Sequence, residues 1–236
     1  MDNYQSIREE AFEANLEIPK RNLAIYTWGN VSAFDPERGV FAIKPSGVDY
    51  ERLTPSSMVV VDLDGKIVDG TLNPSSDTET HRILYRAFSG GVIRGITHTH
   101  SPYATSWAQA RRPVPVFGTT HADYAAESIP CTAYVSEEAV HNNYERETGN
   151  LIVETFRREK RDLLSMPMAL VAGHGPFTWG ASAREAVYHA AVLEEICKIG
   201  VFTLLLNPGA EALPPHIIQK HWERKHGPGA SYGQRP

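Results

Sequence analysis

Apolar residues near the start of the chain recur at the spacing of a helix. Ile7, Phe12 and Leu16 share one side of this segment and predict a helix over about residues 4–20. We expect this helix to stop before Pro19, because proline removes a backbone hydrogen bond and clashes with the preceding turn.

Two later segments show the same period. The pattern predicts a helix over residues 76–88, with a buried stripe formed by Ile83, Leu84, Ala87 and Phe88. The longest apolar stretch predicts a helix over residues 183–206, but Glu194, Glu195 and Lys198 interrupt it. Because charged side chains are expensive inside a bilayer, we expect this helix to face the protein core and not to span a membrane.

Short runs rich in β-branched residues predict strands. The expected strands cover residues 31–34, 40–43, 59–62, 66–68, 92–100 and 169–172. Turn residues at 35–39 and 63–65 join the first four strands as two hairpins. No repeat or low-complexity linker divides the chain. Hairpins with interspersed helices favour one α/β layered domain around a largely antiparallel sheet.

Composition narrows the class of protein. The 236 residues are 42% hydrophobic and 22% charged, as in an ordinary soluble globular protein, and they carry a formal net charge of −5. This charge argues against nucleic acid as the main partner but leaves room for a small phosphorylated ligand. The polar, acidic N-terminus is no signal peptide, and the two cysteines, Cys131 and Cys197, lie in no paired motif. We therefore expect a cytoplasmic protein with reduced thiols and no membrane contact.

Three histidines suggest a metal site. His98 and His100 lie two residues apart on an expected strand, where both side chains point to one face. The pair alone leaves two interpretations open, a shared cation or two core histidines bonded to their neighbours. His174 follows an apolar run and is flanked by Gly173 and Gly175, which permit a sharp turn. Three histidines with an open position are typical of a catalytic zinc centre, although His174 alone is equally explained by a bond to a loop carbonyl.

Two polar turns are candidate phosphate sites. Ser76 and Glu79 match a capping box, which predicts a well-capped helix start beside Asp77. The free N–H groups of such a helix start also attract phosphate, and Ser75 and Ser76 add hydroxyl donors. The turn Lys44-Pro45-Ser46-Gly47 offers further donors, but turns of this composition are common.

Seven segments together resemble a known family. They are, in order, Thr27–Ser32, Ile43–Val48, Pro74–Thr78, His98–Ser101, Gly118–Tyr124, Gly173–Phe177 and Tyr232–Gln234. They are similar to the L-ribulose-5-phosphate 4-epimerases of the class II aldolase superfamily, over about residues 4–234. The resemblance implies a single α/β/α domain over residues 1–236, with a central, mostly antiparallel sheet flanked by helices. It also implies a homotetramer with active sites between subunits, each reached by a C-terminal tail at residues 226–236.

The resemblance also assigns roles to residues. The implied metal ligands are Asp77, His98, His100 and His174, usually around Zn²⁺, with Mn²⁺ or Co²⁺ as substitutes. The implied substrate and phosphate residues are Gly29, Asn30, Ser46, Gly47, Ser75 and Ser76, with Lys44 as a helper. Asp123 and Tyr232 match the acid–base pair, contributed from a neighbouring subunit. Thr119, Glu145, His221 and Arg224 match residues near the site.

The implied reaction is retro-aldol cleavage of C3–C4 and re-addition on the other face of the aldehyde, which inverts C4 of L-ribulose 5-phosphate. An aldolase of the L-fuculose-1-phosphate type is the nearest alternative, but such enzymes carry a glutamate where this chain has Asp77. A non-enzymatic scaffold like the adducin head would lack the metal ligands. Without the resemblance, Asp123 would be interpreted as part of a helix cap, and Tyr232 as part of a disordered tail.

Overall fold

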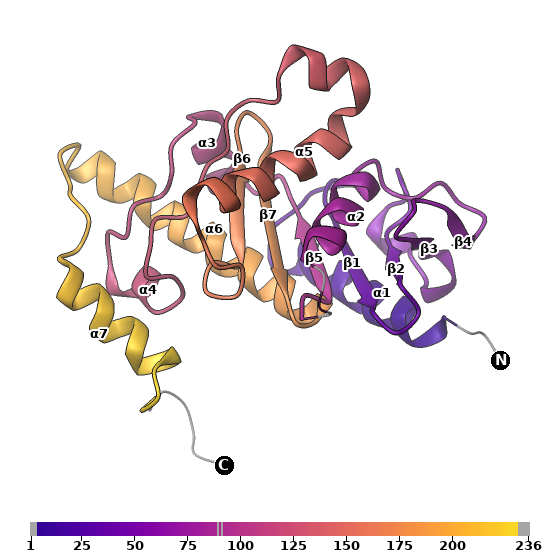
Figure 1. Cartoon of the computed structure of the whole chain (residues 1–236), viewed down its shortest axis with the longest axis horizontal. Helices are drawn as coiled ribbons and strands as arrows, with labels where there is room; N and C mark the ends of the chain where they lie inside the picture. Colours follow the sequence, from indigo (N-terminus) through magenta and orange to yellow (C-terminus); the bar gives the residue numbers. More distant parts are fainter. Residues whose placement is uncertain (1–3, 89, 91, 231–236) are drawn as a thin grey trace.

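A single antiparallel sheet forms the centre of the computed structural model, which describes residues 4–88, 90 and 92–230 (Figure 1). In chain order the strands are β1 Asn30–Asp35, β2 Val40–Ile43, β3 Val59–Asp62, β4 Ile67–Asp69, β5 Gly95–His98, β6 Met168–Val171 and β7 Gly175–Gly180. Their spatial order is β4-β3-β2-β1-β5-β7-β6, and each neighbouring pair is antiparallel. The predicted sheet type and both predicted hairpins are confirmed.

Helices cover both faces of this sheet. They are α1 Gln5–Lys20, α2 Thr78–Ala87, α3 Pro102–Gln109, α4 Thr119–Ala122, α5 Glu137–Glu159, α6 Ala183–Leu206 and α7 Pro215–His226, with short 3-10 turns η1 Tyr50–Arg52 and η2 Pro55–Ser57. Helices α2 and α5 pack on one face in a core that includes Phe41, Ile96 and Trp179. Helix α1 and the start of α6 pack on the other face, over Val31 and Ala42. The predicted α/β/α layering is confirmed.

The first helix differs from its prediction at its end. Helix α1 runs through Pro19 to Lys20. Proline is tolerated there because the helix closes beyond it, through hydrogen bonds from Arg21 N to Glu17 O and from Asn22 N to Pro19 O. The buried face also differs from the predicted one: it is formed by Ile7, Arg8, Ala11, Ala14, Asn15 and Ile18, whereas Phe12 and Leu16 are only half-buried.

The predicted capping box is wrong. Helix α2 begins at Thr78 with Asp77 as its N-cap residue, and the Glu79 carboxylate accepts two hydrogen bonds from Arg82 instead of reaching back. The predicted stripe of α2 is correct only in part, since Leu84 is fully buried while Ile83, Ala87 and Phe88 are partly buried. The ordered helix start nevertheless places Asp77 beside Asn30, at the first residue of the central strand β1.

Strand β5 is shorter than the predicted segment 92–100, because its pairing with β1 and β7 ends at His98. The helix predicted over residues 183–206 is confirmed as α6. Within the described residues, none of the helices combines the length and apolarity that crossing a bilayer requires.

Candidate metal centre and substrate pocket

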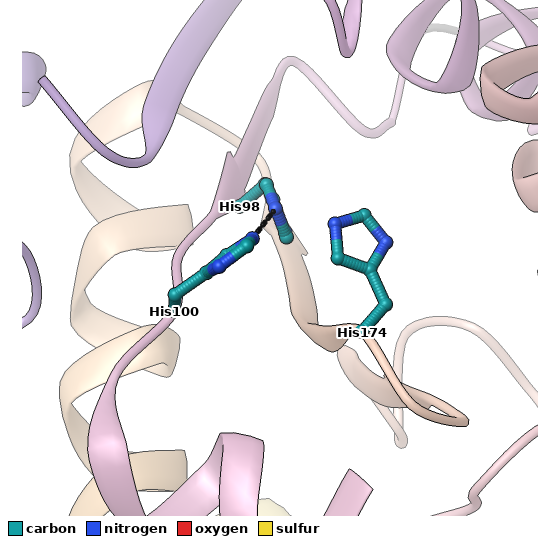
Figure 2. Close-up of side chains that lie close together, drawn as sticks. All are labelled: His98, His100 and His174. Carbon is teal, nitrogen blue, oxygen red and sulfur yellow. Dashed lines mark hydrogen bonds between the residues drawn. The ribbon is translucent and has the colours of Figure 1, made fainter. Parts of the chain in front are cut away.

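Three histidine side chains converge at one end of the central strands (Figure 2). His98 ends β5, His100 follows two residues later, and His174 lies in the turn between β6 and β7. Their rings are 4.7–5.1 Å apart between centroids. One nitrogen from each ring can be chosen so that all three lie within 4.8 Å of one another, a spacing that can hold one cation. The predicted convergence of these three histidines is therefore present in the fold.

The hydrogen bond of His98 fixes which nitrogen faces its neighbours. His98 Nδ1 lies 2.9 Å from Pro176 O, and because a carbonyl only accepts, Nδ1 carries the proton. The Nε2 lone pair of His98 then faces His100 Nε2 at 3.0 Å. Two imidazole nitrogens at this distance share either one proton or one cation. A histidine anchored by its other ring nitrogen is the usual arrangement of a metal ligand, so the residues fit a divalent cation such as zinc.

Burial favours the neutral form of two of these histidines, His174 and His100. It lowers the pKa of His174 to about 3, with the neighbouring His98 adding to the effect. The pKa of His100 is also lowered, first by burial and then by His98. Because metal binding requires deprotonated imidazole, the two rings are in the ligating form at neutral pH without first losing a proton.

Asp77 lies beside the histidine cluster. Its Oδ2 accepts a 2.7 Å hydrogen bond from Asn30 Nδ2 and lies 4.0 Å from His98 Nε2. Burial opposes its ionisation, but His98, the other nearby histidines and Asn30 outweigh burial and lower the pKa of the carboxyl. The structure thus places an anionic carboxylate at the edge of the cluster, next to the three-histidine group and not within it.

A cavity of about 590 Å³ opens from the histidines. Its walls include every predicted substrate and metal residue: Gly29, Asn30, Ser46, Gly47, Ser75, Ser76, Asp77, His98, His100 and His174. Gly29 and Gly47 adopt φ values of +76° and +67°, which side chains rarely allow, and this explains the glycines in both turns. Six segments that are far apart in sequence therefore meet around one pocket.

Lys44 brings a positive charge to the pocket wall. Its Nζ donates to Thr27 O at 3.2 Å and lies 5.1 Å from the Tyr50 ring centroid. Burial lowers the pKa of Lys44 to about 8. The ammonium is thus held by a carbonyl oxygen and an aromatic ring, neither of which carries a negative charge. Its positive charge therefore favours binding of an anion in the pocket.

Of the two predicted acid–base residues, Asp123 lies away from this cavity. Asp123 caps the C-terminal end of α4, where its carboxylate accepts hydrogen bonds from Arg224 Nη2 at 2.7 and 2.8 Å and lies 3.1 Å from His221 Nδ1. Neither Asp123 nor Thr119 lines the cavity of its own chain. Tyr232 falls outside the described residues.

Three cavity residues were not predicted as site residues. Glu145 was expected near the site and does line the cavity, together with its neighbour Tyr144, whose ring lies 5.9 Å from that of His174. Thr27 and Trp28 also line the cavity, with the Trp28 ring centroid 6.1 Å from that of His100. Both lie within the recognised segment Thr27–Ser32, whereas the only signal for Tyr144 was its place next to Glu145.

Comparisons with known proteins agree with this geometry. Residues 9–201 match the family described as Class II Aldolase and Adducin N-terminal domain. The chain is 47% identical over 231 residues to proteins named L-ribulose-5-phosphate 4-epimerase UlaF from Salmonella paratyphi A and Salmonella typhi, covering 98% of this chain and 100% of theirs. A solved L-fuculose 1-phosphate aldolase superposes with a TM-score of 0.75 at 25% identity, covering 93% of this chain and 95% of that one. The chain belongs to the class II aldolase and adducin N-terminal domain family.

Proposed function

We propose that this protein is an L-ribulose-5-phosphate 4-epimerase, which interconverts L-ribulose 5-phosphate and D-xylulose 5-phosphate by breaking and remaking the C3–C4 bond. One observation carries the proposal: a single cavity joins a three-histidine cluster to a wall of phosphate-binding donors. A phosphorylated ketose has the matching chemistry, with chelating oxygens near C2 and C3 and a dianion at its far end. The 47% identity to named epimerases over nearly the whole chain supports the same activity.

The phosphate end of the substrate binds at the turns. Ser46, Ser75 and Ser76 supply hydroxyl donors, and the buried Lys44 supplies a cation within the same cavity. Gly47, at a φ of +67°, turns the chain beside these donors without adding a side chain to the cavity wall. This clamp keeps the two-carbon aldehyde fragment, which carries the phosphate, bound after cleavage while its carbonyl group turns, so that recombination with the three-carbon enediolate is effectively intramolecular.

His98, His100 and His174 hold the divalent cation, which we take to be Zn²⁺, with Mn²⁺ or Co²⁺ as substitutes. When bound, the cation is a Lewis acid that withdraws electron density from the ketose carbonyl and so stabilises charge as C3–C4 breaks. The hydrogen bond from His98 to Pro176 O orients the first ligand. Asp77 is ionised and lies beside His98. Its carboxylate either binds the cation together with the three histidines or holds a polar group at the edge of this cluster.

Proton transfer at the C4 oxygen is assigned to Asp123 and Tyr232 of a neighbouring subunit. The C4 oxygen must lose a proton in one orientation and regain it in the other, which requires an acid–base group on each side of the aldehyde. Asp123 lies off its own cavity and is held by Arg224 and His221, a placement suited to reaching the cavity of another copy. The proposal therefore includes a homotetramer in the cytoplasm with composite sites, and with neither nucleic acid nor membrane as a partner.

The experiment is incubation of the Zn²⁺-loaded protein with L-ribulose 5-phosphate while both possible products are measured. Accumulation of D-xylulose 5-phosphate without free glycolaldehyde phosphate is the expected result. Stoichiometric glycolaldehyde phosphate and dihydroxyacetone without epimer would instead identify an aldolase, the activity named for the structural relative.

A further inference from the structure

Helix α2 faces strand β1 through a ladder of hydrogen bonds. Asp77, His81 and Tyr85 recur every four residues and share one face of the helix, while Asn30 and Ser32 share one face of the strand. Asn30 Nδ2 donates to Asp77 Oδ2 at 2.7 Å. One turn further along, Ser32 Oγ lies 2.7 Å from His81 Nδ1 and 2.7 Å from the Tyr85 hydroxyl.

His81 is an unusual residue for such a buried place. Its exposed fraction is 0%, and its Nε2 has no hydrogen-bond partner among the described residues. Burying a polar ring with one unpaired nitrogen is costly, and an apolar side chain of similar volume would pack there at lower cost. Stability alone therefore does not explain this histidine.

The surroundings of His81 connect it to the metal centre. Its ring meets the Phe177 ring edge-on at 6.2 Å, and His98 stacks on the same Phe177 ring at 4.2 Å. On the strand side, Asn30 is paired directly opposite His98 across β1 and β5. The ladder thus joins the helix that carries Asp77 to the strand that neighbours His98.

We propose that His81 is a positioning residue, which with Ser32 fixes the rotation of α2 and thereby sets Asp77 against the three histidines. The proposal rests on the proposed metal-dependent function. The Asn30–Asp77 bond holds the start of the helix and the Tyr85 hydroxyl contacts Ser32 from two turns further on, whereas the Ser32–His81 bond holds the turn next to Asp77 and so limits the rotation of that turn about the helix axis. For a carboxylate about 5 Å from that axis, a rotation of about 15° moves the oxygen by roughly 1.3 Å. Ligand-to-metal distances vary by only about 0.2 Å between sites of one kind, so a rotation of this size decides whether the Asp77 carboxylate contributes to Zn²⁺ binding.

The test measures Zn²⁺ affinity by competition with a chromogenic chelator, with no substrate present. We expect His81→Leu to weaken Zn²⁺ binding at least tenfold, within the range of about 10- to 100-fold seen when outer-shell partners are lost. Ser32→Ala removes the same bond from the strand side and is expected to weaken binding in the same direction. His81→Asn keeps a hydrogen-bonding atom near the Nδ1 position and should recover affinity to within about threefold of wild type.

Two further variants separate positioning from general destabilisation. His189→Leu is the matched control, because His189 is another mostly buried histidine with one hydrogen bond, to Trp179 O at 2.7 Å, away from the cavity. It should leave Zn²⁺ affinity unchanged even if the melting temperature falls. In an Asp77→Ala background, His81→Leu should cause no additional loss, because its effect passes through Asp77.

The proposal is overturned if His81→Leu and Ser32→Ala both bind Zn²⁺ within twofold of wild type. It is equally overturned if His81→Leu causes the same loss with and without Asp77. If His81→Leu does not fold, Ser32→Ala takes its place. Its Zn²⁺ affinity is then compared with and without Asp77→Ala, and the same criteria decide whether the proposal is overturned. Because Zn²⁺ binding is read without any sugar phosphate, the outcome is independent of which substrate the enzyme converts.

Discussion

Raising the pH from 7 to 9 should reduce kcat/KM through Lys44. Its pKa of about 8 is below the usual 10.5 because of burial, so the ammonium that faces the substrate phosphate is lost as the pH rises through 8. A group with this pKa is about 90% charged at pH 7 and about 10% charged at pH 9, which predicts a roughly tenfold fall in kcat/KM. The profile of kcat/KM reports the free enzyme, the state to which this pKa belongs.

The variant Lys44→Met isolates this group. Losing a charged hydrogen bond to phosphate costs about 1.5–3 kcal/mol, which corresponds to roughly a 10- to 150-fold lower kcat/KM at pH 7. The variant should also lose the alkaline fall between pH 7 and 9. A variant that keeps the fall, or a wild-type profile that stays flat to pH 9, would refute the assignment of Lys44.

The same substitution should make the protein more stable. The pKa of Lys44 in the folded chain is lower than the unfolded value near 10.5, so the unfolded state holds more protons between pH 8 and 10.5. The burial penalty is therefore complete below pH 8 and fades as the pH approaches 10.5. The gain in Tm of Lys44→Met over wild type should follow this course, largest at pH 7 and smaller at pH 10.

Three further predictions follow from the site and the fold. Dialysis against a chelator should abolish activity, and Zn²⁺, Mn²⁺ or Co²⁺ should restore it; full activity without metal would contradict the assignment of the histidines. Asp123→Asn should slow turnover at least tenfold with the metal content unchanged, and mixing it with Lys44→Met subunits should restore part of the activity if sites are shared between copies. Gly95→Ala should lower Tm strongly or prevent folding, because a Cβ there would collide with the backbone of Ser182 and Ala183, whereas an alanine at Gly118, which has open space and a φ of −147°, should cost much less.

Patterns along the chain predict the parts of the fold that have local causes. Both hairpins were recognised because turn residues separate two β-branched runs. Strand β7 was missed, since Gly175 and Pro176 begin it and all six of its residues are buried, which leaves no alternation to detect. Helix α5 was missed because it is strongly charged and broken at Asn143, where φ is −170°. Its place in the fold depends on packing against α2, where Gly149 allows close contact with Ile83.

The candidate site was predictable where short motifs carry its chemistry. The turns around Lys44, Ser75 and His174 are separated by long stretches of sequence, yet each contains recognisable donors that the fold brings to one cavity. Neither Trp28, which lies within the segment Thr27–Ser32, nor Tyr144 was given a role, because an aromatic residue in or beside a motif has no chemical signature of its own. The position of Asp123 off its own cavity depends on the packing of α4 against α7, where Arg224 and His221 contact its carboxylate, and no local pattern encodes this long-range contact.

The most direct test of the central claim is the reaction of L-ribulose 5-phosphate in D₂O, with the hydrogen content of the product followed by NMR. Breaking and remaking C3–C4 leaves the hydrogens on both carbons in place, so D-xylulose 5-phosphate should form without deuterium at C3 or C4. Inversion by removal and return of the C4 proton would introduce solvent deuterium at C4. That result would contradict the account of how this cavity and its histidines act on the substrate.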